Sequence, residues 1–182
     1  MLNAPNIITL VRIGLVPVSA YYLATKMYGI ALLVFLVAAL SDFADGYVAR
    51  RFKLASTLGA TLDPIADKLN MLVATVFLTL QGLLPLWLAS AIVARDAVIV
   101  LGALAYRTTL GHVKIAPTRL SKINTAIEFA VLLLVMASAA SWIDVGASLT
   151  PFFVLAFISI VVSGVQYVWV WGRKAIAEGR TR

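Results

Sequence analysis

Residues 41–70 read SDFADGYVARRFKLASTLGATLDPIADKLN and carry four aspartates, Asp42, Asp45, Asp63 and Asp67, between two long apolar runs. Ionised carboxylates are costly beside a low-dielectric region, and acids in such surroundings usually serve a function. An account of the fold and the function must therefore explain why four acids lie so close together in the sequence.

The composition is typical of an integral membrane protein. The 182 residues are 62% hydrophobic and 13% charged, with a mean hydropathy of +0.99. A soluble domain carries about 25% charged residues, roughly twice this fraction. Apolar stretches of about 20 residues recur along the whole length, and each is long enough to cross the hydrocarbon core as a helix. The sequence therefore predicts an all-α membrane protein.

We predict six transmembrane helices in a single domain that covers residues 1–182. Breaks in the apolar pattern, such as Gly82 with Pro85, separate the predicted spans. The spans are residues 7–23, 28–48, 59–80, 84–106, 123–142 and 151–171.

The basic residues predict how these spans are oriented. They concentrate in every second link and in the C-terminal tail, whereas the other links contain only Lys26. Because basic loops stay on the cytoplasmic side, both termini and the aspartate stretch are expected at the cytoplasmic face of a multi-pass protein, in the inner or plasma membrane of a bacterium. The net charge of +7 then reflects loops that face an anionic leaflet, and nucleic-acid binding is not expected. The residues concerned are Arg50, Arg51, Lys53, Arg107, Lys114, Arg119, Lys122, Arg173, Lys174, Arg180 and Arg182.

The spacing of the aspartates indicates a site for cations. Asp42 and Asp45 are three residues apart and Asp63 and Asp67 are four apart, so each pair shares one face of a helix. The short link between the second and third spans makes these helices antiparallel neighbours, with the two pairs at a similar depth. Carboxylates that converge in this way repel one another, and hard oxygen ligands without His or Cys suit Mg²⁺ or Mn²⁺.

Small residues and an arginine surround these acids in the sequence. Gly46, Ala49 and Gly59 would let a ligand approach the backbone, and Arg50 can bind a phosphate with two hydrogen bonds. Cations, carboxylates and arginine together indicate chemistry on a phosphate ester at the membrane surface. The simpler alternative is that the acids form interfacial salt bridges with nearby basic residues and that Arg50 is only a cytoplasmic anchor.

The complete pattern resembles a known signature. D-x-x-D-G-x-x-A-R at residues 42–50, eight intervening residues, and G-x-x-x-D-x-x-x-D at residues 59–67 are similar at every fixed position to the signature of the CDP-alcohol phosphatidyltransferase family. This resemblance implies a membrane protein of six helices, with the motif across the second and third, and a homodimer.

The resemblance also implies an activity and residue roles. The activity is transfer of a phosphatidyl group from CDP-diacylglycerol to an alcohol, with release of CMP. Asp42, Asp45, Asp63 and Asp67 would hold two divalent ions, and Asp67 would also take the proton of the acceptor hydroxyl. Contacts to the nucleotide would come from Gly46, Ala49, Arg50 and Gly59.

Two further stretches bear on the acceptor alcohol. PNIITLVR at residues 5–12 resembles the branch that contains phosphatidylglycerophosphate synthases and cardiolipin synthases. PTRLSKINTA at residues 117–126 is more similar to the cardiolipin synthases, since the other enzymes tend to show Gly-Lys-x-Lys-Thr there. We therefore favour phosphatidylglycerol as the acceptor over glycerol 3-phosphate. The candidate acceptor-binding residues are Arg95, Arg119, Lys122 and Asn124, although loop charge alone would also explain Arg119 and Lys122.

Some charged residues within the predicted spans have more than one possible role. Arg95 and Asp96 lie in the middle of the fourth span, where they either pair with buried groups or belong to the site. Glu128 is a candidate partner for Arg95, and Arg12 lies near the cytoplasmic end of the first span, where its side chain can reach the membrane surface. Two other functions use intramembrane acids, a divalent-cation transporter and a membrane prenyltransferase. The acids gather at one end of two spans, and no Asp-Asp-x-x-Asp motif is present, so the transferase is favoured.

Overall fold

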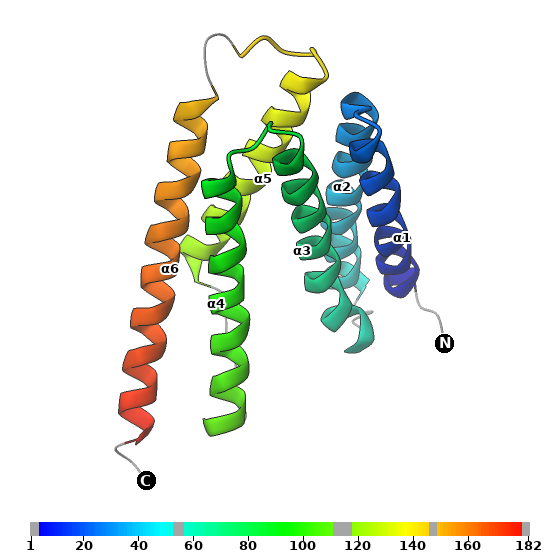
Figure 1. Ribbon diagram of the computed structural model, residues 1–182. Coiled ribbons are helices and arrows are strands. Elements are labelled where there is room, and N and C mark those ends of the chain that lie inside the picture. Colours follow the sequence, from blue (N-terminus) through cyan, green and yellow to red (C-terminus); the bar gives the residue numbers. More distant parts are fainter. Residues whose placement is uncertain (1–3, 53–56, 111–117, 146–148, 180–182) are drawn as a thin grey trace. The chain divides into compact units, whose positions relative to one another are not determined.

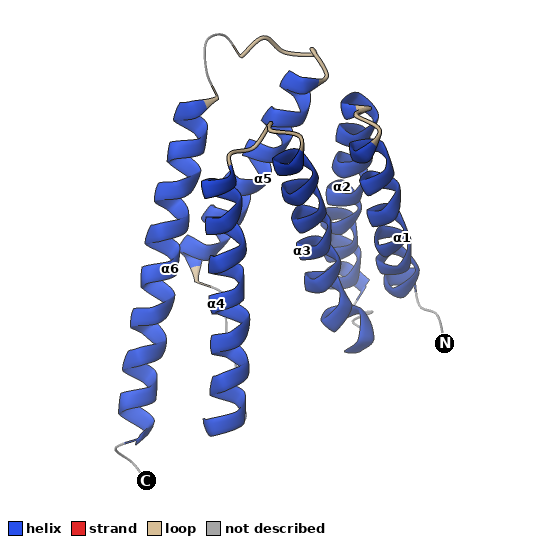
Figure 2. Ribbon diagram, in the orientation of Figure 1, coloured by secondary structure: helices blue, strands red, loops and turns tan. Residues whose placement is uncertain are grey.

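In the computed structural model of the chain, residues 4–52, 57–110, 118–145 and 149–179 are described. Within these ranges every regular element is an α-helix (Figure 2). The helices are α1 (Ala4–Ala24), α2 (Tyr28–Phe52), α3 (Thr57–Leu80), α4 (Leu86–Leu110), α5 (Arg119–Ala139) and α6 (Thr150–Gly179).

The prediction of an all-α fold is confirmed, and each predicted span corresponds to one of these helices. Two segments among the described residues are long and apolar enough to cross a membrane, namely Arg119–Ala139 and Thr150–Val170. The apolar stretches described in α1, α2 and α3 are shorter, at Ile13–Ala24, Tyr28–Ser41 and Lys68–Leu80. The six-span topology and the cytoplasmic termini therefore remain predictions.

The helices divide into two compact units. The first unit contains α1, α2, α3 and the part of α5 from Leu132 onward. In it, α1 packs against both α2 and α3 (Figure 1). The second unit contains α4, the part of α5 up to Val131, and α6, with α4 packed against α6.

Small side chains allow the helices of the first unit to approach one another closely. Ala31 and Ala38 of α2 and Ala74 of α3 are almost completely buried, beside the larger Phe35 and Leu78. Between apolar helices in a lipid environment, association depends on such close van der Waals packing and on hydrogen bonds rather than on the hydrophobic effect. Small and large buried side chains thus pack together where these helices meet.

Three helices end in the same type of cap, a Schellman motif with one residue in the left-handed conformation. At the end of α3, Gly82 has φ +74°, its N–H donates to Thr79 O at 3.0 Å, and the next N–H, of Leu83, donates to Leu78 O at 2.9 Å. Lys26 after α1 and Ser141 after α5 occupy the equivalent position with φ 59° each. Glycine suits this conformation, whereas Lys and Ser are strained there.

A polar contact joins three helix ends in the first unit. The Gln81 side chain, just after α3, donates from Nε2 to Leu23 O at 2.6 Å and accepts at Oε1 from the Tyr28 hydroxyl at 2.8 Å. Leu23 lies at the end of α1 and Tyr28 begins α2. The Leu23 carbonyl also accepts from Lys26 N–H in the cap of α1, so the Gln81 amide adds a second bond there and holds the turn from α1 into α2.

Candidate active site

The backbone places both halves of the aspartate motif on helices. Asp42 and Asp45 lie in α2, which continues to Phe52, and Asp63 and Asp67 lie in α3, which begins at Thr57. Positions three or four apart on a helix fall on one side of it, so each pair of positions shares a side. The remaining motif residues, Gly46, Ala49, Arg50 and Gly59, lie on the same two helices. The side chains of all eight residues, and that of Arg12 in α1, lie outside the described residues.

The two halves of the motif lie at adjoining helix ends. Because α2 ends at Phe52 and α3 starts at Thr57, the chain returns after a short link and the two helices run antiparallel (Figure 1). The set of donors that the two halves offer consists only of carboxylates, which fits Mg²⁺ or Mn²⁺ better than a soft metal. Among the side chains that the structure describes, no three His, Cys, Asp or Glu come together as a possible metal site.

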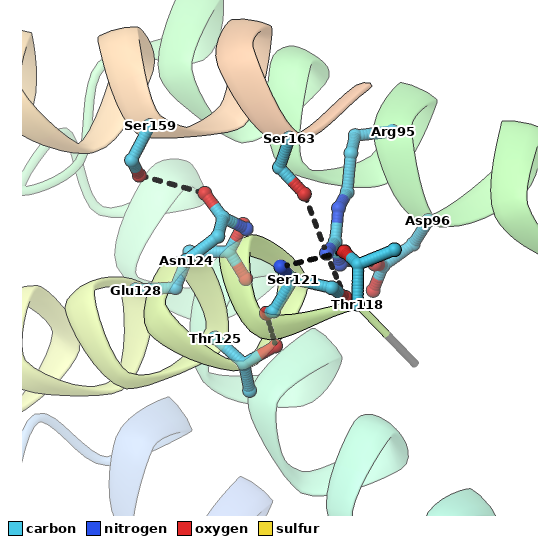
Figure 3. Close-up of polar contacts among 9 residues, drawn as sticks. All are labelled: Arg95, Asp96, Thr118, Ser121, Asn124, Thr125, Glu128, Ser159 and Ser163. Atoms are coloured by element: carbon cyan, nitrogen blue, oxygen red, sulfur yellow. Dashed lines mark hydrogen bonds and ion pairs between the residues drawn. The ribbon is translucent and has the colours of Figure 1, made fainter. Parts of the chain in front are cut away.

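A second polar cluster, centred on Arg95 of α4, lies within the second unit (Figure 3). The Arg95 side chain is 3% exposed, and its Nη1 lies 2.8 Å from Asp96 Oδ1 in an ion pair. Its Nη2 donates to Ser121 Oγ at 2.6 Å and to Ser163 Oγ at 3.2 Å. One guanidinium therefore connects α4 to both α5 and α6, as a planar donor with several N–H groups can.

Asn124 makes two contacts nearby, one within α5 and one to α6. It is 1% exposed, its Nδ2 donates to Glu128 Oε1 at 2.7 Å, and its Oδ1 accepts from Ser159 Oγ at 2.7 Å. The Asn124 amide thus has one partner on its own helix and one on α6. The polar atoms of Asn124 are thus engaged within the protein.

The start of α5 is held by a local cap. The backbone N–H of Ser121 donates to Thr118 Oγ1 at 3.2 Å, so Thr118 is the N-cap and satisfies one of the free N–H groups of the first turn. Ser121 therefore uses its backbone for the cap and its hydroxyl for Arg95. The cap and the arginine together fix the first turn of α5.

The four candidate acceptor-binding residues fall into two different environments. Arg119 and Lys122 are exposed in the first turns of α5. Arg95 and Asn124 are buried in the contacts just described, and the ion pair with Asp96 is what the pairing interpretation of Arg95 predicts. Sequence reasoning missed the serines that complete these contacts, because serine is common in membrane helices and usually bonds its own helix. The serines are Ser121, Ser159 and Ser163.

Comparisons with known proteins show the family of the chain. A sequence model described as CDP-alcohol phosphatidyltransferase matches residues 2–169. The chain is 37% identical to "Cardiolipin synthase (CMP-forming)" of Homo sapiens over 75% of this chain and 50% of that protein. It is 34% identical to the protein of that name from Streptomyces coelicolor over 86% of this chain and 74% of that protein. It is 30% identical to "CDP-diacylglycerol--glycerol-3-phosphate 3-phosphatidyltransferase" of Rickettsia typhi over 92% of this chain and 96% of that protein.

The chain spans about half the length of the human relative, and 30% of a cardiolipin synthase and hydrolase fusion protein from Schizosaccharomyces pombe to which it is also similar. The family match, in contrast, extends over nearly all of this chain and through both units. This match, together with relatives aligned over most of their own length, shows that the chain belongs to the CDP-alcohol phosphatidyltransferase family.

Proposed function

We propose that the protein transfers a phosphatidyl group from CDP-diacylglycerol to an alcohol and releases CMP. The observation that carries this proposal is the complete aspartate motif on the adjoining ends of α2 and α3, within a family match over residues 2–169. A divalent-cation transporter would use intramembrane acids as well, but it would have no need of the glycines and the arginine at fixed spacing between them.

The motif residues divide the work of this reaction. Asp42, Asp45, Asp63 and Asp67 would hold two divalent cations, either Mg²⁺ or Mn²⁺. Such ions, when bound, stabilise negative charge on both the attacked phosphoryl group and the departing phosphate. The nucleotide of the CDP-lipid would be contacted by Gly46, Ala49, Arg50 and Gly59, whose small side chains and guanidinium suit a phosphate.

Asp67 is assigned as the general base of the transfer. The acceptor hydroxyl oxygen forms a bond to the phosphorus of the phosphatidyl group, the bond from that phosphorus to the CMP oxygen breaks, and the hydroxyl proton passes to the Asp67 carboxylate. The base must be within hydrogen-bond reach of the acceptor hydroxyl, and its position one helical turn after Asp63 keeps it beside the other carboxylates.

We favour phosphatidylglycerol as the acceptor. The human and Streptomyces relatives are named as cardiolipin synthases, and Asn124 adds no positive charge to the start of α5. The exposed Arg119 and Lys122 would face the single phosphodiester charge of a lipid acceptor. Glycerol 3-phosphate is the second candidate, because the Rickettsia relative, which the chain spans over 96% of its length, is named for that acceptor.

We further propose one membrane domain of six spans, with both termini and the aspartate motif at the cytoplasmic face of the membrane. The apolar segments of α5 and α6 support this, as do the basic residues in alternate links. The resemblance to the family also supports a homodimer.

Acceptor-dependent release of CMP tests the reaction. The purified protein would be incubated in mixed micelles with Mg²⁺ and CDP-diacylglycerol labelled in the cytidine, with phosphatidylglycerol and glycerol 3-phosphate in parallel reactions. We expect labelled CMP and cardiolipin in the first reaction. CMP release with neither acceptor above the blank would contradict the transferase proposal, and release with glycerol 3-phosphate alone would reassign the acceptor.

The topology can be tested with single cysteines, because the chain contains none. Thr25→Cys and Asp144→Cys lie in predicted external links, whereas Arg173→Cys lies near the C-terminus, and all three positions are exposed. In spheroplasts, a membrane-impermeant maleimide should label the first two and should label Arg173→Cys only after lysis. The reverse pattern would contradict the proposed orientation.

A further inference from the structure

An apolar groove runs along the second unit between α4 and α6. Its volume is about 480 Å³, within the range of sites that bind small ligands. Its walls are formed by Val98 of α4 and by Gly164, Val165, Val168 and Trp169 of α6. Arg95 lies at the end near the polar cluster.

Gly164 gives the groove its depth. A Cβ atom placed on this residue would meet no other atom within 4 Å, so open space lies where a side chain would project. The valines around it are substantially exposed, Val165 at 64% and Val168 at 63%. The groove is therefore open along one side, as expected for a slot that a flexible chain enters laterally.

Among the described side chains, Arg173 lies beside the other end of the groove, next to Trp169. The guanidinium of Arg173 lies 4.2 Å from the ring centroid of Trp169, which is a cation–π contact. Arg173 is exposed, and it follows Trp169 by about one helical turn toward the C-terminus. An apolar slot with an indole ring and a guanidinium at its rim matches the boundary between acyl chains and headgroup of a phospholipid.

We propose that this groove binds one acyl chain of the lipid acceptor, a phospholipid with a single phosphodiester charge such as phosphatidylglycerol, with its phosphate beside Arg173. The inference rests on the proposed function. The acceptor is favoured over CDP-diacylglycerol because the groove belongs to the unit that contains Asn124, whereas the motif for the nucleotide lies on α2 and α3 in the other unit.

Filling the groove should weaken binding of the lipid acceptor selectively. In Gly164→Leu the new side chain would occupy the slot, and exclusion of roughly two methylene groups of the acyl chain would raise KM for phosphatidylglycerol about tenfold. The value of kcat and the KM for CDP-diacylglycerol should stay unchanged. Gly14→Leu is the matched control, because Gly14 is also a helical glycine without neighbours within 4 Å of an added Cβ, and it lies in α1.

A binding measurement makes the inference independent of turnover. In a protein with Trp87, Trp142 and Trp171 changed to Phe, Trp169 is the remaining tryptophan, and its fluorescence is quenched by phospholipid brominated in the acyl chain. Brominated phosphatidylglycerol should quench at a several-fold lower mole fraction than brominated phosphatidylcholine, and Gly164→Leu or Arg173→Gln should remove this preference.

The possible outcomes separate the two proposals. Equal quenching by both lipids would mean ordinary boundary lipid and would overturn the groove site. An unchanged KM for phosphatidylglycerol in Gly164→Leu would overturn its role in acceptor binding, and a raised KM for CDP-diacylglycerol instead would assign the groove to the donor. Failure of the unmodified protein to release CMP would contradict the proposed function, whereas selective quenching in that same protein would still support a phospholipid site.

Discussion

Arg95 of α4 and Ser121 of α5 are joined by a hydrogen bond of 2.6 Å between guanidinium Nη2 and hydroxyl Oγ. Ser121 also donates its backbone N–H to the Thr118 cap, so the arginine acts on the turn that presents Arg119 and Lys122. Arg95 is therefore best understood as a positioning residue for the start of α5, with its charge balanced by Asp96.

Replacing this arginine by lysine should cost stability. Arg95→Lys keeps the charge, but one ammonium group has a different geometry and cannot reproduce the fork that contacts Asp96, Ser121 and Ser163 together. We expect a loss of about 2–3 kcal/mol in unfolding free energy, measured by denaturant titration in mixed micelles. Val93→Leu, at an exposed position on the same helix, should stay within about 0.5 kcal/mol. Equal stability of both variants would contradict the positioning role.

Two helix caps offer stabilising substitutions. Lys26 and Ser141 have φ 59°, a conformation that glycine adopts without the clash of a Cβ atom. Lys26→Gly and Ser141→Gly should each raise the unfolding free energy by about 0.5–1 kcal/mol, because relief of strain exceeds the added flexibility of the unfolded chain. Gly82→Ala, at φ +74° with no neighbour within 4 Å of the added methyl group, is the control and should destabilise by about 1 kcal/mol through strain alone. Destabilisation by both glycine substitutions would contradict this account.

The aspartate motif predicts loss of turnover without loss of folding. Asp42→Asn or Asp63→Asn removes one carboxylate from the cation site, and CMP release should fall by about 10²–10³-fold or more. Thermal stability without added metal should hold or rise, because the substitution removes repulsion among the carboxylates. Asp144→Asn, an exposed acid outside the motif, should retain full activity. Full activity in either motif variant would contradict the assignment of the metal ligands.

Asp67 is expected to behave differently from the other three aspartates. As the general base, Asp67→Asn should lower kcat by about 10²–10⁴-fold while binding of CDP-diacylglycerol, measured by equilibrium dialysis of the detergent complex, changes far less. Parallel losses of binding and turnover would instead indicate that Asp67 serves only as a metal ligand.

Features that depend on a short stretch of sequence could be predicted, whereas contacts between residues far apart in the sequence could not. The six helices followed from apolar stretches of about 20 residues, and Gly82, expected to break the apolar pattern, lies in the left-handed cap after α3. The contact of Arg95 with Ser121 and Ser163 joins residues 26 and 68 positions apart, and no pattern in the sequence relates them. The left-handed Lys26 and Ser141 were likewise not predicted, since their residue types do not favour that conformation.

Asn124 carries the last prediction, which concerns the choice of acceptor. The sequence comparison suggested that lysine at this position would add charge for a phosphate dianion, but Asn124 is buried between Glu128 and Ser159. A lysine there would direct its ammonium group to the Glu128 carboxylate one turn along α5 and would lose the bond from Ser159. Asn124→Lys should therefore lower kcat/KM for phosphatidylglycerol, by about tenfold, through displacement of α6 from α5.

A neutral variant separates the loss of these contacts from the added charge. Asn124→Met has an unbranched side chain of similar reach and cannot replace either hydrogen bond, so it should show a comparable loss in cardiolipin formation if the contacts matter and the charge does not. If Asn124→Lys alone gains activity toward glycerol 3-phosphate, the charge at this position selects the acceptor directly. Full cardiolipin synthesis by both variants would show that Asn124 has no part in acceptor selection. Formation of phosphatidylglycerophosphate without cardiolipin by the unmodified protein would show that phosphatidylglycerol is the wrong acceptor.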